Sequence, residues 1–213
     1  MKTNIHGDKV GIILKDVQMV TMQQDHIPNE ISNVEQSVYE TIYSDTINYK
    51  SYGYGFHGET FVPYFVSQQP KSLLDVGCGH NDFVHALRAE GIKDTWGIDF
   101  ACPGADQLAD ILQLPFKNNE FEWITAWDVM EHLRPEQIDD ALTELSRVSK
   151  YFSFTIAYWP SVTKVGERGL HPTVWSWQEW KNKIEQYATL INDPMVPIPE
   201  LGFWIGEWRN ENN

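Results

Sequence analysis

The stretch "SLLDVGCGHNDF", residues 72–83, joins an apolar run to a turn with two closely spaced glycines. The run "SLLDV" is typical of a buried strand, and the residues after the turn predict a helix over 82–90. Gly77 and Gly79 allow a sharp turn and let a ligand approach the backbone closely. A strand, a turn and a helix in this order indicate a ligand site at the carboxyl end of a strand.

Two carboxylates make this turn a poor match for a phosphate. Asp75 stands just before the glycines, and Asp82 occupies the position where a dinucleotide fingerprint has its third glycine. A carboxylate at the start of the helix competes with a pyrophosphate for the same amides, and the lysine of a P-loop is absent. We therefore expect a cationic ligand, such as the sulfonium and ammonium groups of S-adenosylmethionine, rather than a nicotinamide dinucleotide.

From Lys71 onward, strand patterns alternate with helical patterns. Strands are predicted at 72–76, 95–99, 121–127, 151–158 and 201–208. A helix is predicted from Pro135 onward, and another after Ser176, which has capping-box spacing with Glu179. This alternation predicts an α/β fold with a doubly wound, mostly parallel sheet that carries helices on both faces.

The segment before this pattern, residues 1–68, reads as a lead-in. Residues 10–20 favour one or two short strands, and Ser32 with Glu35 favours a capping box at the start of a helix. The Tyr- and Gly-rich residues 49–60 predict a lid over the cofactor.

The bulk composition narrows the class of protein and its partners. The chain has 213 residues and a formal net charge of −14, with no run of Lys or Arg, so nucleic acid is an unlikely partner. No stretch is long enough to cross a membrane, and no signal peptide is recognised. Two cysteines, Cys78 and Cys102, favour the reducing cytoplasm. The oligomeric state is not predicted.

Three motifs in order resemble those of the class I S-adenosylmethionine-dependent methyltransferases, over residues 71–158. They are "LLDVGCGHND", "WGIDF" and "ADILQLPFKNNEFEWITAWDVMEHL". The resemblance implies a Rossmann-like sheet of seven strands and S-adenosylmethionine as the cofactor. It also implies that 1–213 form one methyltransferase domain, with the cofactor-binding core at 71–158 and an acceptor-side insert and closing strands at 159–213.

The resemblance further implies which residues bind the cofactor. They are Asp75, Gly77, Cys78, Gly79, Asp99, Phe100, Asp110, Ile111, Trp127 and Asp128. The residues of the glycine turn then hold the methionine end, Asp99 the ribose and Asp110 the adenine edge. Trp127 and Asp128 flank the methionine and the transfer site.

The sequence departs from the family pattern in two places. Asn81 replaces the usual third glycine, and Asn tolerates the left-handed backbone conformation. Only ten residues separate Asp99 from Asp110, so the helix that family members have there is expected to be very short or absent.

Three histidines are candidates for the catalytic base: His132, His171 and His57. A hydroxyl acceptor needs a base, and each of these residues is predicted in a loop near the cofactor. His132 has a structural alternative, and His171 has another, capping the helix near Ser176. No metal site is predicted, because the histidines lack the spacing of metal ligands.

Tryptophans concentrate in the last third of the chain. Trp177 and Trp180 have helical spacing and favour the core, whereas Trp159 and Trp175 favour a platform for a planar acceptor. We therefore expect O- or N-methylation of a small organic molecule. The alternatives are a methyltransferase for RNA or a glycan, and a non-catalytic subunit that binds S-adenosylmethionine.

Overall fold

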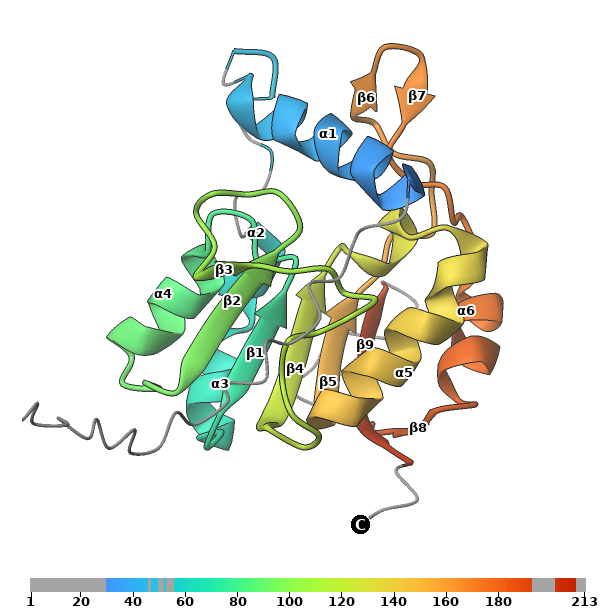
Figure 1. Cartoon of the computed structure of the whole chain (residues 1–213). Helices are drawn as coiled ribbons and strands as arrows, with labels where there is room; N and C mark the ends of the chain where they lie inside the picture. The colour runs from blue at the N-terminus through green and yellow to red at the C-terminus, as the bar shows by residue number, and fades with distance from the viewer. Residues whose placement is uncertain (1–29, 46, 50–51, 53–55, 193–201, 210–213) are drawn as a thin grey trace, which may run out of the picture.

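A seven-stranded sheet in the order β3-β2-β1-β4-β5-β9-β8 organises the protein (Figure 1). The structure, a computed structural model, describes residues 30–45, 47–49, 52, 56–192 and 202–209. The strands of the sheet are β1 (Leu73–Val76), β2 (Thr95–Asp99), β3 (Gln107–Leu108), β4 (Phe121–Trp127), β5 (Ser149–Thr155), β8 (Ala188–Leu190) and β9 (Phe203–Trp208). A separate hairpin is formed by β6 (Lys164–Val165) and β7 (Arg168–Gly169).

Strands β1 to β5 pair in parallel, and β9 is antiparallel to both β5 and β8. Leu73 of β1 lies opposite Thr95 of β2 on one side and Trp123 of β4 on the other. The chain therefore builds outward from β1 to β3 and then returns to β4. A reversal of this kind opens a crevice at the carboxyl ends of the central strands, where such sheets bind ligands.

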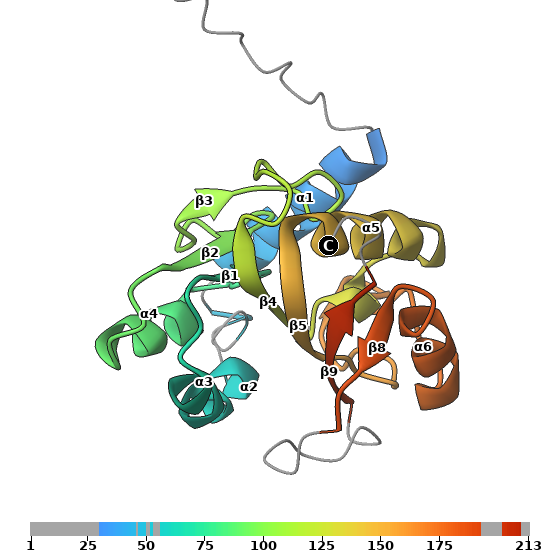
Figure 2. The same ribbon diagram turned by 90° about the horizontal axis from the view of Figure 1, so that it is seen from below.

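Helices cover both faces of the sheet, as predicted (Figure 2). One face carries α3 (Val62–Gln68) and α4 (Asp82–Ala89), and the other carries α5 (Ile138–Val148) and α6 (Trp177–Ile184). Successive strand residues point to opposite faces, so Leu73 packs in the first of these layers and Leu74 in the second. Both side chains are fully buried.

Helix α1 (Glu30–Ser44) lies across the carboxyl edge of the sheet, next to the β6–β7 hairpin (Figure 1). The predicted capping box is wrong, because the helix begins at Glu30 and therefore includes Ser32. Glu35 instead bonds to Arg134 at 2.8 Å and to Arg168 at 2.6 Å. These ion pairs connect α1 to the loop after β4 and to the hairpin.

The remaining predicted elements compare closely with the structure. The helix predicted from Pro135 starts as a 3₁₀ turn, η2 (Pro135–Gln137), and continues as α5. No helix lies between Asp99 and Asp110, as expected. Strands β3 and β8 and the β6–β7 hairpin were not predicted, and the strands predicted at 10–20 lie outside the described residues.

Among the described helices, none is both long and apolar enough to cross a membrane.

Candidate active site

The glycine turn after β1 is built from left-handed backbone. Gly77 has φ +70° and Gly79 has φ +53°, and Asn81 has φ +68° at the start of α4, the conformation expected for that residue. A Cβ atom on Gly77 would lie 2.5 Å from Cγ2 of Val129. Both the backbone conformation and this close contact therefore require glycine at position 77.

Asp75 lies beneath the turn and does not line the pocket described below. Its carboxylate is 1% exposed and accepts a hydrogen bond of 2.6 Å from Oγ1 of Thr125. Burial raises the pKa of Asp75 to about 8, and the hydrogen bond from Thr125 opposes this shift only in part. Asp75 thus presents no full negative charge to a ligand at neutral pH. Cys78 is buried as well, and burial raises the pKa of its thiol.

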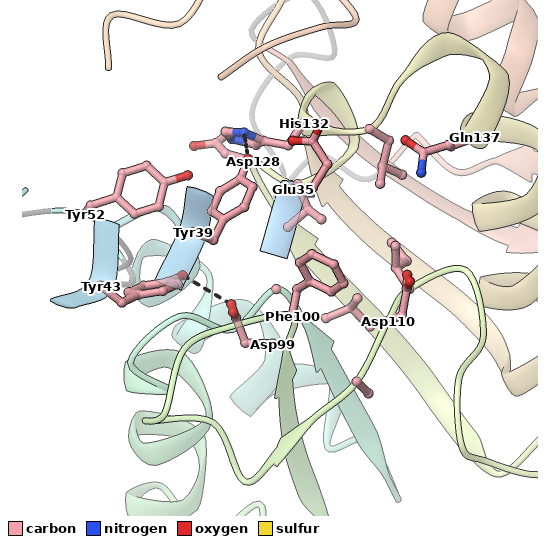
Figure 3. Close-up of a pocket in the computed structure, with 16 residues that line it drawn as sticks. Glu35, Tyr39, Tyr43, Tyr52, Asp99, Phe100, Asp110, Asp128, His132 and Gln137 are labelled. Carbon is pink, nitrogen blue, oxygen red and sulfur yellow. Dashed lines mark hydrogen bonds between the residues drawn. The ribbon is translucent and has the colours of Figure 1, made fainter. Parts of the chain in front are cut away.

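Asp99 connects three segments around the turn, and Figure 3 shows its contact with Tyr43. Its Oδ1 accepts from the amides of Ala101 (2.9 Å) and Cys102 (2.8 Å). Its Oδ2 accepts from the amide of Gly79 (3.0 Å) and from the hydroxyl of Tyr43 (3.3 Å). The carboxylate at the end of β2 therefore fixes the glycine turn, the following loop and α1 in place.

A pocket opens at the switch point, where sheets of this kind bind ligands. Of the predicted site residues it brings together Gly77, Asp99, Phe100, Asp110, Ile111, Asp128 and His132. We call it the cofactor pocket. Its charged lining residues are acidic (Glu35, Asp99, Asp110 and Asp128), and none of the described lining residues is Lys or Arg. Glu35 is paired with Arg134 and Arg168, so Asp99, Asp110 and Asp128 are the acids that suit this lining to a cationic ligand rather than a phosphate.

Three tyrosines also line the cofactor pocket: sequence reasoning missed Tyr39 and Tyr43, whereas Tyr52 lies in the segment 49–60 predicted as a lid. Tyr39 and Tyr43 come from α1, and Tyr52 follows that helix (Figure 3). Burial raises the pKa of all three hydroxyls, so they remain protonated. The spacing of Tyr39 and Tyr43 places both on one side of a helix, which is a signal that the sequence offered.

Trp127 and Asp128 follow β4 but face different environments. The ring of Trp127 stacks on Phe61 with centroids 4.9 Å apart, and it lies outside the cofactor pocket. Asp128 has φ +53°, and its amide donates to the carbonyl oxygen (3.1 Å) and to Oγ1 (2.9 Å) of Thr155. This turn brings Asp128 into the wall of the pocket.

A second cavity lies on the other side of Asp128, and we call it the acceptor cavity. It holds about 530 Å³ of empty space and is lined by Asp128, Glu131, Thr155, Ile156, Ala157, Trp159 and His171. Trp159 is 56% exposed, as a platform for a ligand requires. Trp175, the other predicted platform, instead packs on Trp180 in the core, with ring centroids 4.8 Å apart.

The structure brings two of the three predicted histidines together. The rings of His132 and His171 lie edge to face with centroids 4.7 Å apart. Burial and the neighbouring His171 lower the pKa of His132 to about 3, so its ring is neutral and a weak base. Nδ1 of His132 lies 2.8 Å from the hydroxyl of Tyr39 (Figure 3). The side chain of the third candidate, His57, lies outside the described part of the chain.

His171 does not cap α6. Ser176 and Glu179 form the predicted capping box at that helix. Nδ1 of His171 instead lies 2.8 Å from the carbonyl oxygen of Trp159. A carbonyl oxygen only accepts, so Nδ1 carries the proton and Nε2 keeps its lone pair.

Glu131 was not predicted as a site residue, although it immediately precedes His132 in the 3₁₀ turn η1 (Met130–His132). Its side chain is fully buried, and Oε1 accepts from the amide of Ala157 at 2.9 Å. Burial and the nearby Asp128 raise the pKa of this carboxyl to about 8.

A doubly wound sheet with an acidic pocket at its switch point defines a Rossmann-like protein whose pocket suits a cationic ligand. Residues 58–162 match the family model of a methyltransferase domain. The chain therefore carries a methyltransferase domain and is an S-adenosylmethionine-dependent methyltransferase whose fold is that of the class I enzymes.

Solved structures share the fold at low sequence identity. The 1,6-didemethyltoxoflavin-N1-methyltransferase of Burkholderia thailandensis is 14% identical, with a TM-score of 0.59 over 87% of this chain and 91% of its own. Magnesium protoporphyrin IX methyltransferase from Synechocystis PCC 6803 is 14% identical (TM-score 0.55; 86% and 98%). A sugar N-methyltransferase from Streptoalloteichus is 13% identical (TM-score 0.55; 98% of both chains). No curated protein matches the sequence.

Proposed function

We propose that this enzyme methylates an oxygen or nitrogen of a small organic molecule bound in the acceptor cavity. One observation carries the proposal: Asp128 lies in the walls of both cavities, so an acceptor in the second adjoins a cofactor in the first. S-adenosylmethionine supplies the activated methyl group. The task of the protein in such a transfer is chiefly to position the acceptor and exclude water.

The residues of the cofactor pocket fit this cofactor. Gly77 keeps the backbone of the turn accessible, and a side chain there would collide with Val129. Asp99 and Asp110 supply carboxylate oxygens for the ribose hydroxyls and the adenine edge. The acidic lining favours the cationic methionine end, and the tyrosines of α1 exclude water from it.

The acceptor cavity combines one broad aromatic surface with polar groups. Trp159 offers a face on which a planar or sugar-like molecule can stack. Asp128, Thr155 and His171 can orient a hydroxyl or an amine beside it. Nε2 of His171 is the nitrogen that can take up a proton, since Nδ1 is occupied by Trp159.

The alternatives from the sequence fit less well. A net charge of −14 opposes binding of an RNA backbone, and no Lys or Arg is found among the described residues that line either cavity. A non-catalytic subunit would not need the acceptor cavity. The names of the structural relatives mention a didemethyltoxoflavin, a porphyrin and a sugar. The fold therefore accommodates small organic acceptors.

Transfer of label from methyl-labelled S-adenosylmethionine to a metabolite extract tests the proposal. Label is expected in the small-molecule fraction, and Trp159→Ala should reduce its incorporation while leaving S-adenosylhomocysteine binding intact. Label found only in RNA, protein or glycan would contradict the choice of acceptor. Binding of S-adenosylhomocysteine without any transfer would favour the non-catalytic alternative.

We also propose that the enzyme works in the cytoplasm. Cys78 and Cys102 are both free and buried, which suits a reducing compartment.

A further inference from the structure

Three potential metal ligands converge between the cofactor pocket and the acceptor cavity. Glu131, His132 and His171 each offer one ligand atom, and these atoms all lie within 4.8 Å of one another. Glu131 and His132 are consecutive in η1, whereas His171 comes from the loop after the β6–β7 hairpin. The fold therefore assembles this cluster from two segments far apart in the sequence.

The carboxylate of Glu131 has an unpaired oxygen. Oε1 accepts from the amide of Ala157, but Oε2 is buried and no hydrogen-bond donor among the described residues reaches it. Asp128 lies in the same cavity wall and adds a second acid, and no Lys or Arg lines this cavity within the described chain. A buried carboxylate oxygen without a partner is costly, and either a proton, as the raised pKa of Glu131 favours, or a bound cation relieves that cost.

A metal ion is bound by the unprotonated nitrogen of an imidazole. The carbonyl of Trp159 accepts from Nδ1 of His171 and so leaves Nε2 free, which is the outer hydrogen bond typical of metal-bound histidine. His132 hydrogen bonds to Tyr39 through Nδ1 and to the carbonyl of Leu170. Ligation at His132 therefore exchanges one of these bonds for a bond to the ion.

We propose that Glu131, His132 and His171 bind a divalent transition-metal ion that faces the acceptor cavity. Two imidazoles and one carboxylate favour ions such as Zn²⁺, Fe²⁺, Mn²⁺ or Co²⁺ over Mg²⁺ and Ca²⁺. Ligand atoms about 2.0–2.2 Å from an ion lie roughly 3–3.5 Å apart, so ligand atoms that are up to 4.8 Å apart must approach one another by up to about 1.3–1.8 Å. Three protein ligands leave coordination positions open.

The role of this metal site rests on the proposed function, because the open coordination positions of the ion face the cavity assigned to the acceptor. A hydroxyl oxygen bound to a divalent ion is a stronger acid than the free hydroxyl. The site therefore favours a hydroxyl acceptor over an amine. His171 then acts as a metal ligand and not as the group that takes the proton directly.

The full-length enzyme, stripped with a chelator, provides the test. Co²⁺ is titrated into it and binding is followed by calorimetry and by the visible absorption of the ion. A single ion per chain is expected, and both Glu131→Gln and His171→Asn should weaken binding by at least about tenfold. His85→Asn is the matched control, because His85 is exposed on α4, and it should bind Co²⁺ as wild type does.

Failure of this inference and failure of the proposed function are distinguishable. Co²⁺ binding needs no acceptor, and S-adenosylhomocysteine should bind the metal-free and metal-loaded protein alike. Absence of stoichiometric Co²⁺ binding, or wild-type affinity in His171→Asn, overturns the metal site. If circular dichroism shows that Glu131→Gln is unfolded, His171→Asn decides alone. An acceptor found by labelling should shift the Co²⁺ absorption, and an unchanged spectrum would separate the ion from the acceptor.

Discussion

Replacing Asp99 by alanine tests the best-connected carboxylate of the cofactor pocket. The substitution removes the acceptor of three backbone amides, those of Gly79, Ala101 and Cys102, and also the partner of Tyr43. Asp99 is only 6% exposed, so these donors lose their partner in a buried environment. The structure thus predicts losses of both stability and cofactor binding, whereas the sequence alone predicted only the second.

The expected loss of stability in Asp99→Ala follows from the number of backbone amides that lose their acceptor. A buried donor without a partner costs about 1–3 kcal/mol, so three of them cost about 3 kcal/mol even at the lower limit. For a chain of this size that corresponds to a decrease in Tm of roughly 6–12 °C. Asp99→Asn keeps one acceptor oxygen, which can serve Ala101 and Cys102, and should lose only about 1–2 kcal/mol.

Differential scanning calorimetry measures the first effect, and calorimetric titration with S-adenosylhomocysteine measures the second. We expect at least about a tenfold loss of affinity in Asp99→Ala, because the ribose loses charge-assisted hydrogen bonds. Asp106→Ala is the control: Asp106 accepts from the amide of Gly97 and from Arg88 but lies outside the cofactor pocket. It should lower Tm and leave affinity unchanged. Wild-type affinity in folded Asp99→Ala would refute the ribose assignment, and an unchanged Tm would refute the amide argument.

Three further substitutions test other parts of the structure. Gly77→Ala should destabilise the protein by roughly 1–3 kcal/mol in urea unfolding, and Val129→Ala should recover part of this loss; an unaltered midpoint would contradict the contact. Burial alone would raise the pKa of Glu35. Its hydrogen bonds to Arg168 and Arg134 outweigh burial and hold that pKa below the ordinary value. Glu35→Gln should therefore cost about 1 kcal/mol at pH 7, and its Tm difference from wild type should begin to shrink as pH falls below about 4.3, the ordinary value for Glu, and vanish below the lowered pKa of Glu35; a constant difference would exclude the ion pair. Trp159→Ala should raise KM for the acceptor at least about threefold with Tm unchanged, because this ring is 56% exposed; an unaltered KM would exclude the platform.

Local sequence patterns were sufficient to predict most of the sheet. The strand at 95–99 and the strand at 121–127 occur as predicted, because buried parallel strands leave continuous apolar runs. Strands β3 and β8 are only two and three residues long, so no periodicity could reveal them. Ser32 illustrates the opposite error. The sequence has a capping pattern at Ser32 and Glu35, but the helix begins earlier, at Glu30.

The candidate site was predictable where one motif carries it and unpredictable where distant segments meet. Asp99 ends β2 and Asp110 follows β3, both line the cofactor pocket, and their roles toward the ribose and the adenine stay predictions. Tyr43 reaches Asp99 from 56 residues away, and no local pattern contains that contact. Trp175 and Trp159 looked equivalent in the sequence, and only packing against Trp180 separates them.

The turn after β4 explains how two cavities come to share one wall. Asp128 begins this turn in the left-handed backbone conformation, and η1 starts two residues later. Residues of a 3₁₀ helix are about a third of a turn apart, so consecutive side chains face different directions. Glu131 accordingly lines the acceptor cavity and His132 the cofactor pocket. The ring contact between His132 and His171 therefore joins the cofactor pocket to the acceptor cavity.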